Sequence, residues 1–170
     1  MSVRVRQARP EDAERVAEVH VRTWQGAYGH VFPAEALASL SDTLERRAAR
    51  WRATAADPGP REHLLVAEAD GDVVGFAFIG ASADEPACGE LHAIYVLPEA
   101  WGRGAGRALM ADVLRLLPAD GHGEAILWVL EDNPRTRRFY ESAGWRADGG
   151  VKDEEWLGTV VREVRYRIVL

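Results

Sequence analysis

Apolar residues recur along this chain with two different periods, and each period predicts a type of secondary structure. From Ala13 to Trp24 the apolar positions follow the i, i+3, i+4, i+7 spacing of one buried helix face, which also carries His20. Pro10 and the two acidic residues after it predict where this helix begins, because proline fits the first turn and carboxylates favour the positive end of the helix dipole. The run from Ala34 to Ala53, rich in Ala, Leu and Arg, predicts one or two further helices.

Shorter apolar segments bounded by turn residues predict β-strands. They are Val3–Gln7, His63–Ala69, Val73–Ile79, Leu91–Leu97, Ala125–Leu130, a strand from Trp145 onward, and Thr159–Leu170. The Asp70-Gly71 pair between the second and third segments is typical of a tight hairpin. Two more helices are expected, one over Gly104–Leu117 and one that begins after the Asn133-Pro134 cap and ends at Gly144.

The composition narrows the class of protein. With 170 residues, of which 47% are hydrophobic and 28% charged, the chain is expected to form one packed domain over residues 1–170. The net charge of −6 argues against general nucleic-acid binding, which needs cations to neutralise phosphates. Cys88 is the single cysteine and has no metal-ligand spacing around it, so we expect neither an intrachain disulfide nor a metal site. The segment from Met1 to Ala8 contains no long apolar run, and we expect no membrane segment and cytoplasmic residence.

The strongest chemical signal is a turn between a strand end and a helix start, where Gly102, Gly104 and Gly106 occupy every second position. Glycine lets the backbone approach a ligand closely, and the free amides and dipole of a new helix attract phosphate oxygens. Arg103 and Arg107 add positive charge. A dinucleotide-binding turn needs a further glycine that neither register provides, and no Gly-Lys-Ser or Gly-Lys-Thr of a P-loop is present. The turn therefore predicts an anion site of another kind.

The segment around this turn resembles the acetyl-CoA signature of the GCN5-related N-acetyltransferase (GNAT) superfamily, written as Gln or Arg, two residues, Gly, one residue, Gly or Ala. Gly104 and Gly106 match the glycine positions. The later Asn133, Phe139-Tyr140 and Gly144-Trp145 resemble the second motif of that family. The likeness in element order runs from Val3 to the end of the chain, and it is motif-specific from Glu90 to Trp145.

The resemblance implies an α/β (α+β) fold, with a mixed, mostly antiparallel central sheet of about six to seven strands flanked by about four helices. It also implies an N-acetyltransferase that uses acetyl-CoA as co-substrate, with no metal, and acts on a small-molecule amine or a peptide N-terminus. A homodimer is compatible with the family. Two other functions stay open, a GNAT-like acyl-CoA sensor without turnover and a nucleotide-binding enzyme that uses the glycine turn differently.

The same resemblance predicts which residues bind the cofactor. They are Ile94, Tyr95, Val96, Trp101, Gly102, Arg103, Gly104, Ala105, Gly106, Arg107, Asn133 and Arg138. Trp101 departs from the family, which has Gln or Arg at the head of the signature, so a side-chain contact to the pyrophosphate is in question. We expect backbone amides to supply most of the cradle and Arg103 to compensate for the missing side chain.

Acyl transfer to an amine needs a base, because an alkyl ammonium with a pKa of about 10 cannot attack a thioester before it loses a proton. Strand alternation predicts that Glu90, His92, Ile94 and Val96 share one face. Glu90 and His92 are the base candidates on that face. In the histone-acetylating branch of the family the base lies eleven positions before the signature, and counting back from Trp101 reaches Glu90, which we favour. The alternative is an exposed carboxylate at a strand edge.

The departing thiolate needs an acid, and the resemblance places Tyr140 beside the cofactor sulfur as proton donor. A phenol with a pKa of about 10 suits this role. The alternative is a core aromatic that packs against Thr136. For the acceptor the resemblance points to Trp24, Tyr28, His92 and Glu155 as substrate-binding residues, since aromatic and acidic groups attract an ammonium ion.

Overall fold

The computed structural model describes residues 2–170, which form one seven-stranded sheet in the order β1-β2-β3-β4-β5-β7-β6. The strands are β1 (Val3–Gln7), β2 (His63–Ala69), β3 (Asp72–Ala81), β4 (Gly89–Val96), β5 (Glu124–Leu130), β6 (Arg146–Trp156) and β7 (Thr159–Val169). Every neighbouring pair is antiparallel except β4 and β5, which are parallel. The mostly antiparallel α+β fold is therefore confirmed.

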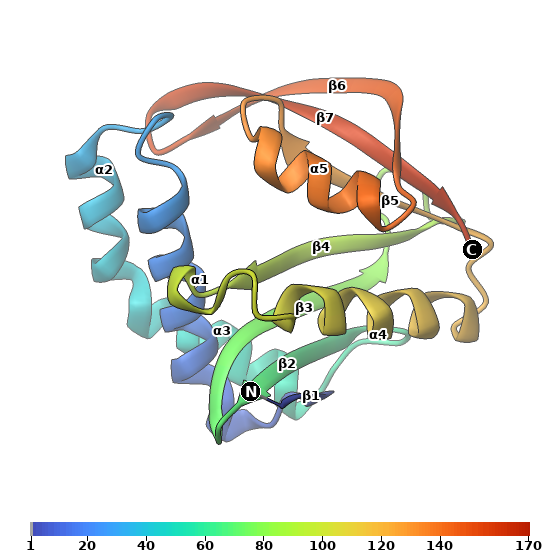
Figure 1. The fold of residues 1–170 in the computed structure, drawn as a ribbon, viewed down its shortest axis with the longest axis horizontal. Helices are drawn as coiled ribbons and strands as arrows, with labels where there is room; N and C mark the ends of the chain where they lie inside the picture. Colours follow the sequence, from blue (N-terminus) through green and yellow to red (C-terminus); the bar gives the residue numbers. More distant parts are fainter. Residues whose placement is uncertain (1) are drawn as a thin grey trace.

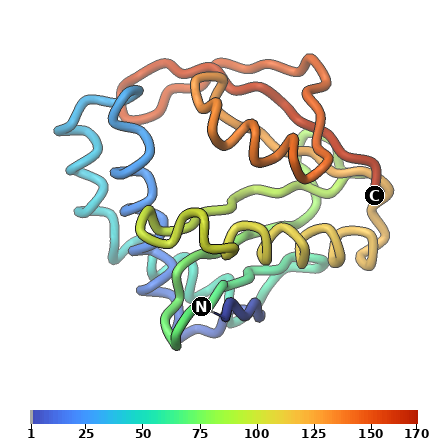
Figure 2. The backbone as a smooth tube through the Cα atoms, viewed as in Figure 1, coloured from blue at the N-terminus to red at the C-terminus, as the bar shows by residue number. Residues whose placement is uncertain are grey.

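Helices cover both faces of the sheet (Figures 1 and 2). They are α1 (Ala13–Ala27), α2 (Ala34–Ser39), α3 (Leu44–Ala56), α4 (Ala105–Ala119) and α5 (Pro134–Ser142). One hydrophobic cluster joins α1 and α3 to one face of β2 and β3, and a second joins α4 and α5 to the other face. None of these helices, nor any other within residues 2–170, combines the length and apolar character that a membrane crossing requires.

The predicted elements are present with small differences at their ends. The run Ala34–Ala53 is divided between α2 and α3, with a short 3-10 turn at Leu40–Thr43 between them. Asp70 and Gly71 both have positive φ, 54° and 91°, which is the backbone that a tight hairpin of this type needs. Asn133 caps α5, because its side-chain oxygen accepts a hydrogen bond from the Thr136 amide at 3.2 Å.

Strands β4 and β5 pair only at their beginnings, and this is the feature that creates a site. Two Cα pairs are in register, Gly89 with Ala125 and Glu90 with Ile126, although β4 has eight residues and β5 has seven. Beyond Glu90 the two strands separate, as Figure 1 shows. The strand ends therefore leave a gap in the sheet, and α4 and α5 begin at its open end.

A β-bulge in β4 overturns the predicted alternation of side chains. Ile79 of β3 lies opposite Leu91, whereas its neighbour Phe78 lies opposite Ala93, so His92 is an extra residue on β4. Past the bulge, Ile94 packs against the α4 side of the sheet and Tyr95 against the α1 side. The expectation that Glu90, His92, Ile94 and Val96 share one face was wrong, because an inserted residue reverses the faces of all residues after it.

Candidate active site

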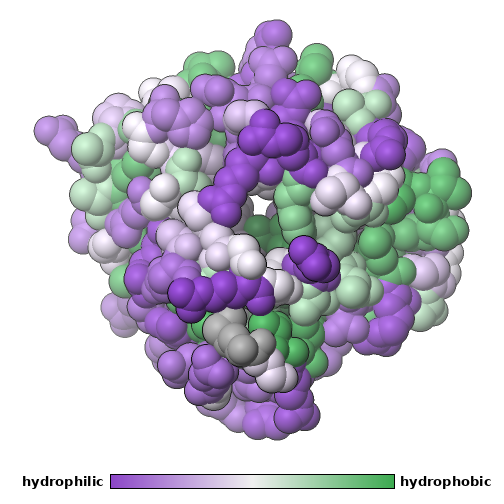
Figure 3. Space-filling model, viewed as in Figure 1, coloured by the Kyte–Doolittle hydropathy of each residue, from purple (hydrophilic) through white to green (hydrophobic). Residues whose placement is uncertain are grey.

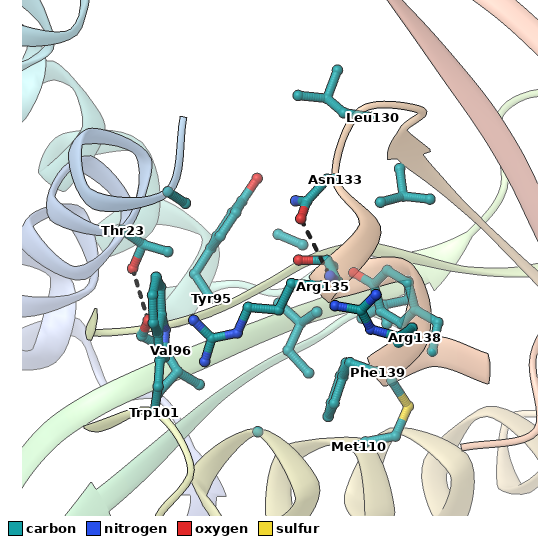
Figure 4. A pocket seen from close by; sticks show the side chains of 18 of the residues that line it. Thr23, Tyr95, Val96, Trp101, Met110, Leu130, Asn133, Arg135, Arg138 and Phe139 are labelled. Atoms are coloured by element: carbon teal, nitrogen blue, oxygen red, sulfur yellow. Dashed lines mark hydrogen bonds between the residues drawn. The ribbon is translucent and has the colours of Figure 1, made fainter. Parts of the chain in front are cut away.

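A cavity of about 850 Å³ lies between the separated ends of β4 and β5. The beginnings of α4 and α5 line it on one side, and the end of α1 lines it on the other. The surface is hollowed near the centre of the face shown in Figure 3, and Figure 4 shows the side chains that project inward. Among residues 2–170, no group of three or more His, Cys, Asp and Glu side chains is placed to hold a metal ion.

The glycine turn forms the floor of the cavity at the start of α4. Gly102 and Gly104 have φ values of 74° and 95°, and beyond their immediate chain neighbours and the local helix backbone no heavy atom lies within 4 Å of the point where either would carry a Cβ. No side chain caps α4, so the amides of its first turn remain available to a ligand. Gly102, Gly104, Ala105, Gly106 and Arg107 all line the cavity. Such a turn can hold a diphosphate through backbone groups.

Trp101 connects the glycine turn to the end of β4 and to the start of α5. Its indole Nε1 donates a hydrogen bond to the Val96 carbonyl at 2.7 Å, which ties the turn to the end of β4. The Arg135 guanidinium carbon lies 3.7 Å from the centre of the Trp101 ring, and both side chains appear in Figure 4. Arg103, the residue expected to compensate for Trp101, does not line the cavity, whereas Arg107, Arg135 and Arg138 do. The arginine-rich start of α5 was the sequence signal for this arrangement.

Tyr140 lies on α5 at the inner wall of the cavity, beside Phe139 and Asn133. It is 6% exposed, and burial raises the pKa of its phenol well above the ordinary value. Its hydroxyl has no hydrogen-bonding partner in the part of the chain that the structure describes. Asn133 also lines the cavity and donates a hydrogen bond from Nδ2 to the Tyr28 hydroxyl at 3.4 Å, so it contributes to both the helix cap and the site.

The two base candidates lie next to each other on β4. The His92 Nδ1 is 3.4 Å from the Glu90 carboxylate. His92 lines the cavity, whereas Glu90 does not. Burial raises the pKa of Glu90, but His92, Ser82 and Lys152 together outweigh this effect and hold the pKa below its ordinary value. Glu90 is therefore ionised at neutral pH. Its carboxylate contacts the imidazole of His92, which lines the cavity.

The predicted acceptor residues separate into two groups. Tyr28 and His92 line the cavity, together with Ile94, Tyr95 and Val96 of β4. Trp24 lies one layer further out and packs its ring 5.1 Å from the ring of Trp156. Glu155 is exposed, because strand alternation turns its neighbour Trp156 toward the cavity instead.

Glu163 was not identified from the sequence. It lies on β7 opposite Leu130 of β5 and Lys152 of β6, is 4% exposed, and lines the cavity. Burial raises its pKa, and the Lys152 ammonium at 3.4 Å only partly counteracts the increase. The available signal was that Glu163 shares a strand face with Val161 by the two-residue period, since acidic side chains are rarely buried unless they are paired.

Comparison with known proteins agrees with this geometry. Residues 14–145 match the model of the acetyltransferase (GNAT) family. The chain is 36% identical over 135 residues to the uncharacterized N-acetyltransferase YuaI of Bacillus subtilis, which covers 78% of this chain and 74% of that protein. It is 38% identical over 124 residues to mycothiol acetyltransferase of Kocuria rhizophila, across 68% of this chain and 39% of that longer protein.

Solved structures share the fold. The PaiA N-acetyltransferase of Thermoplasma acidophilum, in complex with coenzyme A, superimposes with a TM-score of 0.79 at 20% identity over the full length of both chains. The acetyltransferase yncA of Salmonella typhimurium, with acetyl-CoA, gives 0.69 at 18% identity over 99% of this chain and 94% of that one. Because the family model covers most of the chain and relatives match it over two thirds or more of its length, the protein belongs to the GNAT family of acetyltransferases.

Proposed function

We propose that the protein moves an acetyl group from acetyl-CoA to a primary amine by direct attack in a ternary complex. The observation that carries this proposal is the single cavity in which the glycine turn, His92 and Tyr140 all take part. Structures of similar fold were solved with coenzyme A or acetyl-CoA, which supports the choice of co-substrate. The open space above Gly102 and Gly104 suits the close approach of a diphosphate.

Cofactor binding is assigned to residues already placed around the cavity. The amides at the start of α4 hold the diphosphate, and Arg107, Arg135 and Arg138 add positive charge near it. Ile94, Tyr95 and Val96 belong to the separated part of β4, where the backbone has no partner strand on the β5 side. The Val96 carbonyl accepts hydrogen bonds from Trp101 and Thr23. The other peptide groups that this stretch turns toward β5 are available to the pantetheine arm, which extends between the strands toward Tyr140.

The acid and the base lie on opposite sides of the reacting carbonyl in this proposal. Glu90, through His92, takes a proton from the acceptor ammonium. The neutral amine attacks the thioester carbonyl carbon, the new C–N bond forms, and the C–S bond breaks. Tyr140 gives its phenolic proton to the leaving sulfur, and a raised pKa keeps that proton in place until then. The new amide nitrogen gives up its second proton to the Tyr140 phenolate, which restores the phenol, and the Glu90–His92 pair passes the first proton to solvent.

Calorimetry and a thiol-release assay test the proposal together. Acetyl-CoA is expected to bind in the micromolar range and to raise the melting temperature, because a ligand specific to the folded state stabilises it. A panel of spermidine, kanamycin, tyramine and a short peptide with a free N-terminus is then scored for free thiol. Absence of acetyl-CoA binding at millimolar concentration refutes the function, and binding without turnover across a broad amine panel favours an acyl-CoA sensor.

A further inference from the structure

Glu163 is a buried carboxylate that the acid-base scheme does not use. It is 4% exposed, yet it lines the same cavity as His92, and its charge acts on Tyr28 and Tyr95. Its one ion-pair partner within residues 2–170 is Lys152, whose ammonium lies 3.4 Å from the carboxylate. A buried carboxylate is costly to maintain unless a partner neutralises it, and Glu163 shares its partner Lys152 with Glu154. A cationic ligand in the cavity would complete the neutralisation.

The charges around Glu163 do not balance. Lys152, the single lysine of the chain, lies between Glu163 at 3.4 Å and Glu154 at 3.5 Å. Glu90 is close enough on β4 that its charge, like that of Glu154, raises the pKa of Glu163. The ammonium of Lys152 thus lies near three carboxylates, those of Glu90, Glu154 and Glu163. This group has a surplus of negative charge where Glu163 lines the cavity.

The walls next to Glu163 are aromatic and apolar. Tyr28 and Tyr95 line the cavity within reach of the charge of Glu163, and Leu130 lies directly opposite Glu163 across the β5–β7 pair. Trp156 lines the same cavity. Tyr28 and Leu130 belong to one buried cluster against which Trp156 packs. Aromatic rings pack against apolar groups, and their faces also attract cations. This wall can therefore contact both the carbon chain of an amine and its charged ammonium group.

We propose that Glu163 binds the ammonium group of the acceptor, and that the acceptor is an alkyl ammonium ion with an apolar segment next to its amine. The inference rests on the proposed function, since it names the substrate class of the same cavity. Glu163 supplies the opposite charge, Tyr28 and Trp156 enclose the apolar segment, and the ammonium is held beside His92, ready to give its proton to the Glu90–His92 pair. Glu163 thereby selects protonated amines over neutral molecules of the same shape.

A binding experiment that needs no turnover tests this assignment. Trp156 lines the cavity, so the tryptophan fluorescence of the coenzyme A-saturated protein is titrated with hexylammonium chloride and, separately, with hexan-1-ol as a neutral molecule of the same length. The wild type is expected to bind hexylammonium at least about tenfold more tightly than hexanol, and Glu163→Gln to remove most of that preference. Loss of the preference in Glu163→Gln, with coenzyme A affinity unchanged, supports the proposal.

Glu154→Gln is the matched control. Glu154 contacts the same Lys152, but its side chain is 46% exposed and it does not line the cavity, so this variant is expected to keep the preference. Equal affinity of the wild type for hexylammonium and hexanol overturns the proposal, and so does a Glu163→Gln variant that retains the tenfold difference. A third outcome is that the protein binds hexylammonium but releases no thiol from acetyl-CoA with any amine. This outcome counts against the proposed reaction and leaves the ammonium site in place.

Discussion

Replacing Tyr140 by Phe removes a single oxygen from the wall of the cavity and leaves the packing of the ring intact. The Tyr140 hydroxyl has no partner among the described residues, so the substitution leaves no buried donor or acceptor unpaired. The ring itself belongs to the core cluster with Leu109 and Tyr166 and retains those contacts. The free energy of unfolding is therefore expected to change by less than about 0.5 kcal/mol, and acetyl-CoA affinity by less than about threefold.

The chemical step is expected to respond very differently. Burial raises the pKa of Tyr140, so the phenol is protonated across the neutral pH range and available as a proton donor. Loss of a general acid lowers the rate by about a hundredfold or more, which corresponds to about 2.7 kcal/mol in the activation free energy. Because the pKa is raised, the wild-type rate should also show no decline from deprotonation of Tyr140 below about pH 10.

Three measurements on one variant separate the explanations. Thiol release under saturating acetyl-CoA, with an amine that the wild type acetylates, measures the chemical step. Calorimetry measures acetyl-CoA affinity, and thermal unfolding measures stability. If Tyr140→Phe retains turnover within about threefold of the wild type, Tyr140 is a core aromatic and its assignment as proton donor is refuted. A parallel loss of stability and turnover assigns the defect to packing instead.

Further predictions concern the base, the turn and the fold. Glu90→Gln should lower turnover most near neutral pH and recover partly at higher pH, where more acceptor is already neutral; an equal loss at every pH assigns Glu90 to positioning. Gly104→Ala should weaken acetyl-CoA binding and lower the stability, because alanine is strained at positive φ. Gly121 has a similar φ of 91° and equally open surroundings but lies outside the cavity, so Gly121→Ala should lower the stability by about as much as Gly104→Ala and leave the affinity unchanged. Burial, together with the charges of Arg47 and Arg50, lowers the pKa of His20 to about 3 in the folded protein. The folded state therefore favours neutral His20, and the stability that this adds is complete above the unfolded pKa of about 6.5 and is lost as the pH falls toward 3. Urea unfolding at about pH 7.5 and pH 5 should show a loss of about 2 kcal/mol from this residue, and a His20→Phe variant with the same pH dependence as the wild type would contradict the explanation.

Local chemistry was enough to predict the secondary structure and the glycine turn that lines the cavity. The Asp70-Gly71 hairpin and the Asn133 cap each depend on backbone preferences of a few neighbouring residues, and both are present. The glycine turn was recognisable for the same reason, since a positive φ at Gly102 and Gly104 and a new helix immediately after them are properties of contiguous residues. Tyr140 was found through a motif that has a fixed distance from that turn.

The part of the cavity around Glu163 and His92 depended on contacts between residues far apart in the chain. The bulge at His92 follows from the register of β4 against β3, and this register decides on which face each later residue lies. Glu163 reaches the cavity because β7 inserts between β5 and β6, a pairing that no local pattern encodes. Arg135 meets Trp101 only after α5 has packed beside the turn. Neighbouring residues determine backbone conformation within a few positions, whereas strand pairing and burial are decided by the free energy of the whole assembled sheet. The shape and charge of the cavity follow from that assembly.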